Sequence, residues 1–458
     1  MLEPAHASEE TVVVVGAGIA GLSVAQHLTR AGVRPLVLEA ASGVGGRMAT
    51  EKVDGFRLDR IGRLLSTSYP ALRHTPGLDG LVLRPFSPGV LVHSEGRNHR
   101  AGEPTGSRRA RGALNAARAL ASVPRPVRGV RPPLGGPLDH ARLGAALARI
   151  GATEPARLLA RPERPAGRAL AERGLSPRTL HGFLGPLLSA LLCDPDLTTS
   201  SRCAELALHA YATGRLAVPE GGADALPELL AAGLPPGTVR TGVRVTSVAA
   251  NRITTAEHGE FACRGVVLAT DAAAAADLLP GLRVPRFHEV TVVHHAAPEP
   301  PLAEPALLLD ADRLGPVAHT AVISQVDPSR APAGRALISS TVLGPPPAEG
   351  ELRTQLALLY GTSTRCWETL AVHHDARAVP AMPAPHDPRR PVRLLDGLYV
   401  CGDHRDTSTV QGALHSGQRA ARAVLADLGA AQVPASEETE QPEETEEPED
   451  SAPVDKAA

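Results

Sequence analysis

The sequence of 458 residues predicts an α/β fold that combines a parallel sheet with a second, α+β unit. The first observation is an apolar strand at 12–15, followed by a glycine-rich turn and a helical pattern at 22–31. The second is a further strand at 35–39, which completes a βαβ order. The third is the return of strand patterns at 290–343 after a long helical stretch. A hydrophobic content of 43% in a chain of this length allows two or three domains.

The turn after the first strand has the spacing G-x-G-x-x-G, at Gly16, Gly18 and Gly21. We expect Gly16 to make the tight turn, Gly18 to let the backbone approach a pyrophosphate, and Gly21 to let the helix pack closely on the strand. The N–H groups at the start of that helix would then face phosphate oxygens. The second strand ends in Glu39, about twenty residues further on, where a carboxylate accepts hydrogen bonds from a ribose diol. This pattern predicts a Rossmann-type unit that binds a dinucleotide.

A second glycine cluster follows the second strand and contains Gly43, Gly45 and Gly46, directly ahead of Arg47. The guanidinium of Arg47 can hold the same pyrophosphate in a bidentate fork. Enzymes that bind nicotinamide dinucleotides lack this element, so the cluster favours a different dinucleotide.

Further segments that contain glycines and acids follow along the chain. The stretch 54–62 combines acids with glycines, and near the C-terminus Gly402 and Asp403 follow an apolar strand pattern. Gly412 and Ala413 then open a helical pattern that runs through residue 428. In this order, the segments resemble the flavin-containing amine oxidase and phytoene desaturase superfamily.

This resemblance implies that the cofactor is FAD, bound non-covalently. In the superfamily the Gly-Asp pair, here Gly402 and Asp403, holds the ribityl and phosphate region of the flavin. The helix that follows, here near Gly412 and Ala413, points its N-terminus at the isoalloxazine N1 and C2 carbonyl. A positive helix end, equivalent to roughly half a charge, stabilises the negative charge that collects there when the flavin is reduced.

Two internal segments, 191–202 and 218–230, extend the resemblance over most of the chain. A strand pattern follows at 242–248, and in the superfamily a backbone group near Val245 meets the adenine. A buried strand is expected at 265–270.

The flavin-related segments predict a discontinuous FAD-binding domain made of residues 1–80, 218–285 and 390–429. The segments between them, 81–217 and 286–389, form an α+β substrate domain. In that domain we expect a hairpin at 90–100, helices at 138–150, 155–159, 167–173 and 177–192, and strands at 290–294, 306–309, 317–323 and 336–343. These strands are expected to form a sheet that makes one wall of the active-site cavity.

Charge is distributed unevenly along the chain. Residues 430–458 carry ten acids and one lysine, which gives −9 and leaves +7 for residues 1–429 out of a total of −2. This acidic tail lacks aromatic residues and is expected to be disordered. We favour an inert tail over a solubilising brush or a handle for a partner.

Nine arginines fall between residues 97 and 131, and the middle of this segment, 106–123, is expected to form a helix. One interpretation is a lid in peripheral contact with a membrane, because a basic amphipathic helix is attracted to anionic lipid. We favour a solvated face of the substrate domain, because the apolar residues there are mainly alanines. Nucleic acid is not an expected partner, since no binding motif accompanies the arginines and aromatic residues make up 2% of the chain.

No apolar run reaches the roughly twenty residues that a membrane-spanning helix takes, and the N-terminus is acidic where a signal peptide is basic. We therefore expect a cytoplasmic protein. The cysteines Cys193, Cys203, Cys263, Cys366 and Cys401 have no CxxC spacing, so neither a zinc site nor a disulfide framework is predicted, and buried free thiols are expected. Cys401 lies beside the flavin-binding pair, but the covalent cysteines of the superfamily lie well before this motif, so no covalent link is expected.

The substrate class follows from two departures from the amine oxidases, which usually place two aromatic side chains beside the flavin and a lysine near N5. Here the lysines Lys52 and Lys456 fall outside that region, and no aromatic residue directly follows the Gly-Asp pair. Tyr360, Trp367 and Phe183 are among the few aromatic candidates for a cavity wall.

We therefore predict an FAD-dependent oxidoreductase of the dehydrogenase or desaturase type. It takes a hydride from a C–H bond of a largely apolar small-molecule substrate onto flavin N5. The alternatives are a flavin amine oxidase that uses dioxygen and a flavin-binding protein without turnover. The electron acceptor is left open, and the chemistry requires neither a metal nor a protein nucleophile.

His404 is the candidate catalytic residue, because it follows the flavin-binding pair and histidine titrates near neutral pH. A hydrogen bond to flavin phosphate or to backbone is its alternative role. His415, inside the C-terminal helix, is expected to be structural. His373 and His374 lie in a segment that passes over the flavin face in relatives. Neighbours on an extended strand point opposite ways, so at most one faces the ring and no metal pair is expected.

Overall fold

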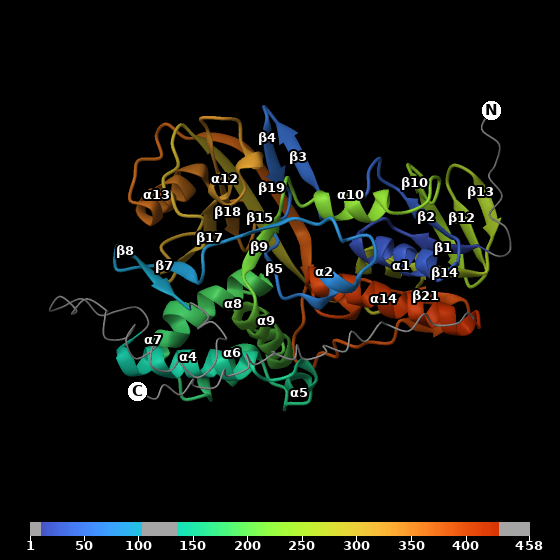
Figure 1. Cartoon of the computed structure of the whole chain (residues 1–458), viewed down its shortest axis with the longest axis horizontal. Helices are drawn as coiled ribbons and strands as arrows, with labels where there is room; N and C mark the ends of the chain where they lie inside the picture. The colour runs from blue at the N-terminus through green and yellow to red at the C-terminus, as the bar shows by residue number, and fades with distance from the viewer. Residues whose placement is uncertain (1–10, 103–134, 430–458) are drawn as a thin grey trace, which may run out of the picture.

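The computed structural model describes residues 11–102 and 135–429. The predicted helix at 106–123, most of the arginine-rich segment and the acidic tail lie outside these ranges. Within them, no helix combines the length and the apolar character needed to cross a bilayer. The described chain forms two lobes, each built around a large sheet (Figure 1).

The first lobe contains a sheet with the strand order β10-β2-β1-β14-β21-β20. Its strands are β1 Val12–Val15, β2 Pro35–Glu39, β10 Val239–Thr241, β14 Gly265–Leu268, β20 Arg393–Leu395 and β21 Leu398–Val400. Neighbours pair in parallel except β20 with β21. Both β1 and β2 have the predicted bounds, and the sheet joins strands from the beginning, middle and end of the chain.

Both faces of this sheet are covered. The covering elements are α1 Ile19–Arg30, α10 Ala225–Ala232, α14 Val410–Asp427, β11 Val245–Ala249, β12 Arg252–Thr255 and β13 Gly259–Ala262. Val12 and Val14 pack in a core with α1, α10 and α14, whereas Val13 and Val15 pack in a second core with β11 and β12. Continuous apolar character is typical of parallel strands buried on both sides, which explains the Val-Val-Val-Val sequence of β1.

The second lobe contains a sheet with the order β19-β15-β18-β17-β16-β7-β8. Its strands are β7 Val90–Ser94, β8 Arg97–Ala101, β15 Phe287–Ala297, β16 Leu308–Asp310, β17 Val317–Val322, β18 Ala336–Val342 and β19 Glu368–Pro380. All neighbours are antiparallel except β16 and β7. The predicted hairpin forms from β7 and β8, whose two-residue turn places Glu95 at φ 51° and Gly96 at φ 73°.

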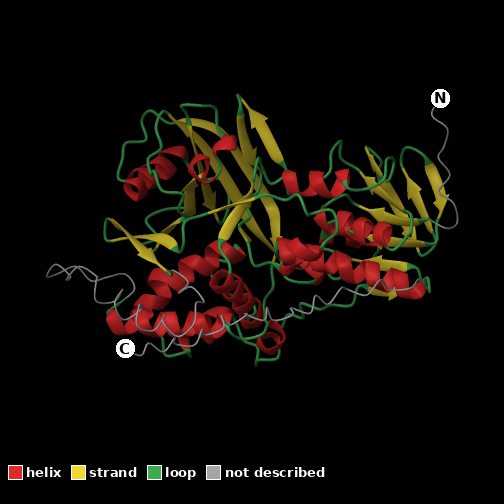
Figure 2. Ribbon diagram, in the orientation of Figure 1, coloured by secondary structure: helices red, strands yellow, loops and turns green. Residues whose placement is uncertain are grey.

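Helices lie on both faces of the second sheet. On one face is α13 Glu349–Tyr360, and the others are α4 Pro137–Gly151, α5 Pro155–Leu159, α6 Ala166–Ala171, α7 Pro177–Thr179, α8 Gly185–Leu192 and α9 Ser201–Thr213. Figure 2 shows the helices α4 to α9 gathered on one side of the sheet. Their apolar side chains share one core with β7 and β17.

The predicted helical segment at 177–192 is helical throughout, but its middle is not α-helical. A π-helical stretch, Leu180–Leu184, separates α7 from α8. Pro186 follows directly in the first turn of α8. Its ring has no N–H for the carbonyl four residues earlier and would clash with it in a regular helix, so the local widening has a steric cause.

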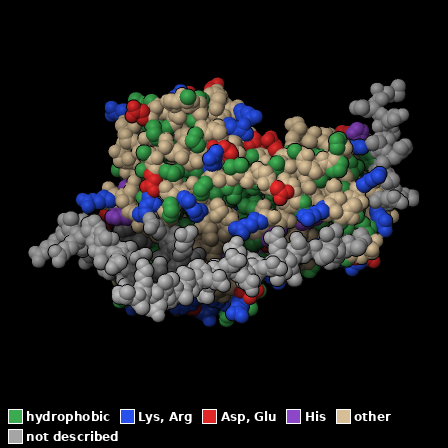
Figure 3. Space-filling view, in the orientation of Figure 1, with side chains coloured by type: hydrophobic (Ala, Val, Ile, Leu, Met, Phe, Trp, Pro, Cys, Tyr) green, Lys and Arg blue, Asp and Glu red, His purple; other side chains and the backbone are tan. Residues whose placement is uncertain are grey.

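Shorter elements complete the fold. They are β3 Thr50–Val53, β4 Phe56–Asp59, β5 Leu65–Ser66, α2 Pro70–His74, β6 Leu83–Pro85, β9 Leu216–Pro219, α11 Ala272–Leu278, α12 Ile323–Val326 and the 3₁₀ turns Pro328–Arg330 and Asp403–Arg405. Figure 1 places β3, β4 and β9 between the two large sheets. On the face shown in Figure 3, basic and acidic side chains of the described residues are interspersed.

Candidate functional site

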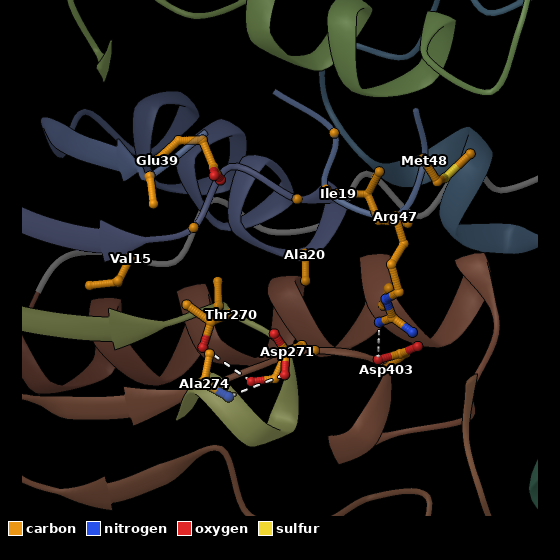
Figure 4. Close-up of a pocket in the computed structure, with 18 of the residues that line it drawn as sticks. Val15, Ile19, Ala20, Glu39, Arg47, Met48, Thr270, Asp271, Ala274 and Asp403 are labelled. Carbon is orange, nitrogen blue, oxygen red and sulfur yellow. Dashed lines mark hydrogen bonds and ion pairs between the residues drawn. The ribbon is translucent and has the colours of Figure 1, made fainter. Parts of the chain in front are cut away.

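A cavity of about 550 Å³ lies at the carboxyl ends of β1, β2, β14 and β21. Ligands of open α/β sheets bind at this edge where the strand order reverses, and β1, between β2 and β14, is such a point. The volume falls within the ~300–1,000 Å³ typical of small-molecule sites. Figure 4 shows Val15 and Glu39 towards one end of the cavity and Arg47, Met48 and Asp403 towards the other.

The three glycines of the first turn have different surroundings. Gly16 has φ +103°, and its N–H donates to the carbonyl oxygen of Leu38 at 2.8 Å. At Gly21, a Cβ would lie 2.1 Å from the carbonyl oxygen of Gly16 and 3.0 Å from the Cβ of Ala269. At Gly18, which lines the cavity with Gly16, a Cβ would meet no described atom within 4 Å. Gly21 therefore lies outside the cavity lining and serves the close packing that the sequence predicts for it.

The N-terminus of α1 faces this cavity. Ile19 and Ala20 line it, and in the described structure the helix starts without a side-chain cap and without an acid in its first turn. The free N–H groups and the positive end of the helix dipole therefore remain available for an anion such as a phosphate.

Glu39 lines the cavity at the end of β2. Its Oε2 accepts from the N–H of Ala17 at 2.8 Å, and its Oε1 accepts from the N–H of Ala41 at 2.8 Å. Each carboxylate oxygen has two lone pairs, so both can still accept from a diol. The N–H of Val243 donates to the Glu39 carbonyl at 2.9 Å, which brings the cavity-lining Val245 to the same region.

Arg47 joins the second glycine cluster to the C-terminal segment. Its Nη2 donates to Oδ1 of Asp403 at 2.7 Å, and its Nη1 donates to the carbonyl of Ala378 at 2.8 Å. Burial opposes both charges, but the ion pair outweighs it, so the pKa of Arg47 is raised and the pKa of Asp403 is lowered. Both line the cavity with Gly45 and Gly46. A bidentate contact of the Arg47 guanidinium with a pyrophosphate stays a prediction, because both of its terminal nitrogens also donate within the chain.

The first turn of α14 forms another part of the wall. Thr409 caps this helix, because its Oγ1 accepts from the N–H of Gly412 at 3.0 Å. Thr409 and Ala413 line the cavity, whereas Gly412 does not. A Cβ at Gly412 would lie 2.0 Å from the carbonyl oxygen of Thr407, so this glycine allows the loop to fold tightly onto the helix.

His404 lies behind the Gly-Asp turn. Gly402 and Asp403 line the cavity, but His404 is not among the lining residues. A Cβ at Gly402 would lie 2.7 Å from Nδ1 of His404, and that nitrogen has no hydrogen-bond partner among the described residues. Burial lowers the pKa of His404 to about 4, so the ring is neutral at pH 7. Its catalytic role stays a prediction.

The other singled-out histidines lie beside carboxylates of the fold. On β19, Nε2 of His373 lies 3.7 Å from Glu51, and Nε2 of His374 lies 3.1 Å from Glu289. Neither lines the cavity, although residues 378–379 of the same strand do. His415 on α14 bonds to Asp406 (Nδ1 to Oδ2, 2.8 Å). Within the described ranges, no group of three His, Cys, Asp or Glu side chains is placed to hold a metal ion.

The cysteines are free, and four of the five are buried. The expectation of buried thiols is wrong for Cys366, which is exposed because it lies in the turn between α13 and β19. Cys401 is fully buried and absent from the lining, and burial raises its pKa to about 12.

The aromatic candidates lie in cores. Tyr360 and Trp367 pack together beside α13, and Phe183 packs among the helices. None of them lines the first cavity or the second, which is described next. The aromatic residue that does line a cavity is Phe86, for which the sequence offered no signal.

A second cavity of about 30 Å³ adjoins the first, and Arg63 lines both. Strands β15, β17 and β18 contribute side chains to it, so the sheet of the second lobe does form a wall. The apolar lining residues are Leu64, Phe86, Val218, Leu307, Ala321, Ile323 and Leu337, and the polar ones are Arg57, Asp59, Arg63, His294, His319, Arg330, Ser339 and Thr341.

Asp59 is held by a buried ion pair. The buried Arg330 donates to Oδ1 from Nη1 at 2.9 Å and to Oδ2 from Nη2 at 3.0 Å, and its Nε also donates to Asp327 at 3.1 Å. Thr50 and the N–H of Ala223 donate to the same Asp59 carboxylate. Burial opposes ionisation of Asp59, but Arg330 outweighs it and lowers the pKa.

A family model described as flavin-containing amine oxidoreductase matches residues 19–425. The chain belongs to this family. The matched range begins with helix α1 and extends into the C-terminal helix α14.

Matches to curated members of flavin enzyme families are local. AofH of Mycobacterium tuberculosis H37Rv, described as a flavin-containing monoamine oxidase, is 39% identical over 87 residues, 19% of this chain and 18% of that protein. Pseudooxynicotine dehydrogenase of a Pseudomonas species is 41% identical over 58 residues, 13% of this chain and 12% of that protein. The chain thus spans less than a fifth of the length of these relatives.

Solved structures match over nearly the whole chain. An oxidoreductase of Methanosarcina mazei has a TM-score of 0.67 at 17% identity and covers 89% of this chain and 98% of its own. Cyclohexylamine oxidase of Brevibacterium oxydans has a TM-score of 0.62 at 18% identity, with 92% and 100% covered. Putrescine oxidase bound to putrescine has a TM-score of 0.63 at 20% identity, with 91% and 99% covered. These identities establish a shared fold.

The cavity of this flavin-containing amine oxidoreductase fits a flavin dinucleotide. A Cβ at Gly18 would project into open space beside the free N-terminus of α1, which leaves room for a phosphate. Glu39 offers acceptors for a ribose diol, and the N-terminus of α14 offers a positive end to a flavin ring. The N-terminus of α1, Glu39 and the N-terminus of α14 therefore match the phosphate, the ribose and the flavin ring of the cofactor in turn.

Several lining residues were missed by the sequence reasoning. Arg63 and His319 line a cavity although they lie outside the glycine motifs. Residues 378–379 line the first cavity as well, and they belong to the segment expected to pass over the flavin face. An arginine directly after the acid-and-glycine stretch was a signal that could have singled out Arg63. His319 has no comparable signal, because only strand pairing brings it to the cavity.

Proposed function

We propose that this protein is an FAD-dependent dehydrogenase or desaturase that oxidises a C–H bond of a largely apolar small molecule. Bound FAD would supply the hydride acceptor, flavin N5. The chain's own residues bind the cofactor, orient the substrate and exclude water.

The observation that carries this proposal is the lining of the two cavities. Among the described residues it contains no lysine, and Phe86 is its one aromatic side chain. An amine substrate is a cation at neutral pH and needs an aromatic cage or a free carboxylate. Asp59, the carboxylate of the second cavity, is already bound by Arg330. The wall of the second cavity, whose carboxylate is already engaged, is therefore better suited to a substrate without an ammonium group.

Non-covalent binding of FAD is supported by the position of the thiols. No cysteine is among the described lining residues of either cavity, and Cys401 is fully buried behind the strand edge. The N-terminus of α1 would bind the pyrophosphate, and the N-terminus of α14 would stabilise negative charge on the reduced ring.

The first test is the pigment. Purified protein should be yellow, and acid precipitation should release the flavin into the supernatant. Colourless protein that does not take up FAD and is not stabilised by it would overturn the proposal. Pigment that stays in the pellet would show a covalent link instead.

The second candidate is a flavin amine oxidase that uses dioxygen. It is favoured by family membership and by the fold shared with putrescine oxidase and cyclohexylamine oxidase. Oxygen consumption with a panel of primary amines separates the oxidase from the dehydrogenase or desaturase. For the dehydrogenase or desaturase, we expect no amine-dependent oxygen uptake above background. Rapid amine-dependent oxygen uptake would establish the oxidase, and flavin that even dithionite cannot reduce would favour a protein without turnover.

A further inference from the structure

Arg63 lies where the two cavities meet. It follows β4 and lines both the flavin-sized cavity and the smaller one. Its Nη1 lies 3.1 Å from Sγ of Cys193, and its Nη2 donates to the carbonyl oxygen of Ser408. A guanidinium has five N–H donors, so three remain for a ligand.

This cation differs from its neighbours because no carboxylate pairs with it within the described ranges. Arg57 pairs with Asp224, and Arg330 pairs with Asp59. The charges of these two arginines are thus compensated inside the fold. Arg63 has no such ion pair, although its charge contributes to lowering the pKa of Asp403, and it borders a partly apolar cavity in which its remaining N–H donors are open to a ligand.

His319 supplies a second polar group to the same cavity. It is 5% exposed, it lines the smaller cavity, and its Nδ1 has no hydrogen-bond partner among the described residues. Burial, with a smaller contribution from Arg63, lowers its pKa to about 4, so it is a neutral donor or acceptor at pH 7. The hydroxyl groups of Ser339 and Thr341 line the same cavity, as does Asp59, whose carboxylate is paired with Arg330.

We propose that Arg63 and His319 form a subsite for a carboxylate carried by the substrate. The inference rests on the proposed function and narrows its substrate class to apolar carboxylic acids. A guanidinium and a carboxylate form paired, charge-assisted hydrogen bonds, and the apolar neighbours strengthen them by excluding water. A volume of about 30 Å³ holds one small polar group, so the remainder of the substrate extends towards the flavin-sized cavity.

The test compares three six-carbon probes that differ only in the end group: hexanoate, hexanol and hexylamine. Each is titrated into the flavin-loaded protein, and binding is followed by the change in flavin absorbance. Hexanoate should bind about tenfold or more tightly than the other two. Equal binding of all three, or a preference for hexylamine, overturns the subsite without variants being needed.

Variants then assign the preference to Arg63. Arg63→Gln should lose the preference for hexanoate, whereas Arg63→Lys should retain part of it. Arg60→Gln is the matched control, since Arg60 is exposed and lines neither cavity, and it should keep the full preference. His319→Asn should weaken the binding of hexanoate more than the binding of hexanol. If Arg63→Gln binds hexanoate with the same preference as the wild type, the proposal is overturned.

The flavin content of each sample separates the two levels of inference. Protein without flavin contradicts the proposed function itself. Flavin-loaded protein that is reduced by an uncharged substrate at the same rate in wild type and in Arg63→Gln contradicts the carboxylate subsite alone. Loss of flavin from Arg63→Gln, with the wild type showing no preference among the probes, would show that Arg63 holds the cofactor.

Discussion

Gly18 and Gly21 lie three residues apart and have opposite steric surroundings. A Cβ at Gly21 would overlap the backbone carbonyl of Gly16, whereas a Cβ at Gly18 would project into open space at the cavity. Gly21 is therefore needed for packing of the folded chain, and Gly18 leaves room for a ligand.

Replacing each glycine by alanine should separate these roles. Gly21→Ala should destabilise the protein by at least ~1–3 kcal/mol, because the new methyl group meets rigid backbone. Gly18→Ala should leave the Tm of the flavin-free protein nearly unchanged but weaken FAD binding about tenfold or more. Thermal melts and FAD titration measure the two effects. An unchanged FAD affinity in Gly18→Ala would contradict the location of the cofactor.

The ion pair between Arg47 and Asp403 predicts a dependence of stability on pH. The pKa of Asp403 is lowered in the folded protein, so its contribution is complete above the ordinary carboxyl pKa of about 3.9 and is lost as the pH falls through the folded value. Asp403→Asn should cost ~1–3 kcal/mol at pH 7, and this difference should shrink below about pH 4.

Urea unfolding at both pH values measures this difference. The control is Asp396→Asn, whose carboxylate is 90% exposed and should matter little. A stability loss in Asp403→Asn that grows on acidification would be inconsistent with the ion pair.

At the scale of elements, α14 contributes both structure and site. It packs against α1 in the main core, and its capped first turn lines the cavity. Its sequence is alanine-rich with apolar residues on one face, which explains why the pattern predicted it well. The helical segment at 177–192 was predicted too, but its π-helical middle was not, because Pro186 alters the hydrogen bonding while leaving the apolar pattern intact.

Removal of the α14 cap should test the coupling of this helix to the cofactor. Thr409→Ala should lower stability by ~0.5–2 kcal/mol, since the N–H of Gly412 loses its acceptor. Thr409→Ser keeps the hydroxyl and should restore most of the loss. Tm and FAD affinity are measured together. Equal stability of the alanine and serine variants would argue against a capping role.

At the scale of the whole molecule, residues close in sequence were predictable and residues brought together by packing were not. The glycine turn, Glu39 and Arg47 belong to local motifs; Gly16, Gly18, Glu39 and Arg47 line the cavity, and Gly21 packs against the strand turn. Arg63, which follows β4, and His319 on β17 line the same cavity only because the chain folds these distant segments together, which no local pattern records. The sheet of the second lobe likewise requires the pairing of β7 with β16, strands more than 200 residues apart.

Because one ligand would contact both ends of the chain, its binding should stabilise the entire fold. FAD at about 100 times its Kd should add ~2.7 kcal/mol of unfolding free energy. Differential scanning fluorimetry of flavin-free protein with increasing FAD measures this effect as a rising Tm. Riboflavin, which lacks the phosphates and the adenosine, is the control and should raise the Tm much less.

The position of β14 and α14 has a consequence for synthesis on the ribosome. β1 lies between β2 and β14, and α1 packs on α14, so the nascent N-terminal unit has no complete core until residue 427 has emerged. At a synthesis rate of ~5–20 residues per second, its apolar strands remain without these packing partners for on the order of 20–80 s. Chains that stop before α14 should therefore require chaperones and accumulate as aggregates.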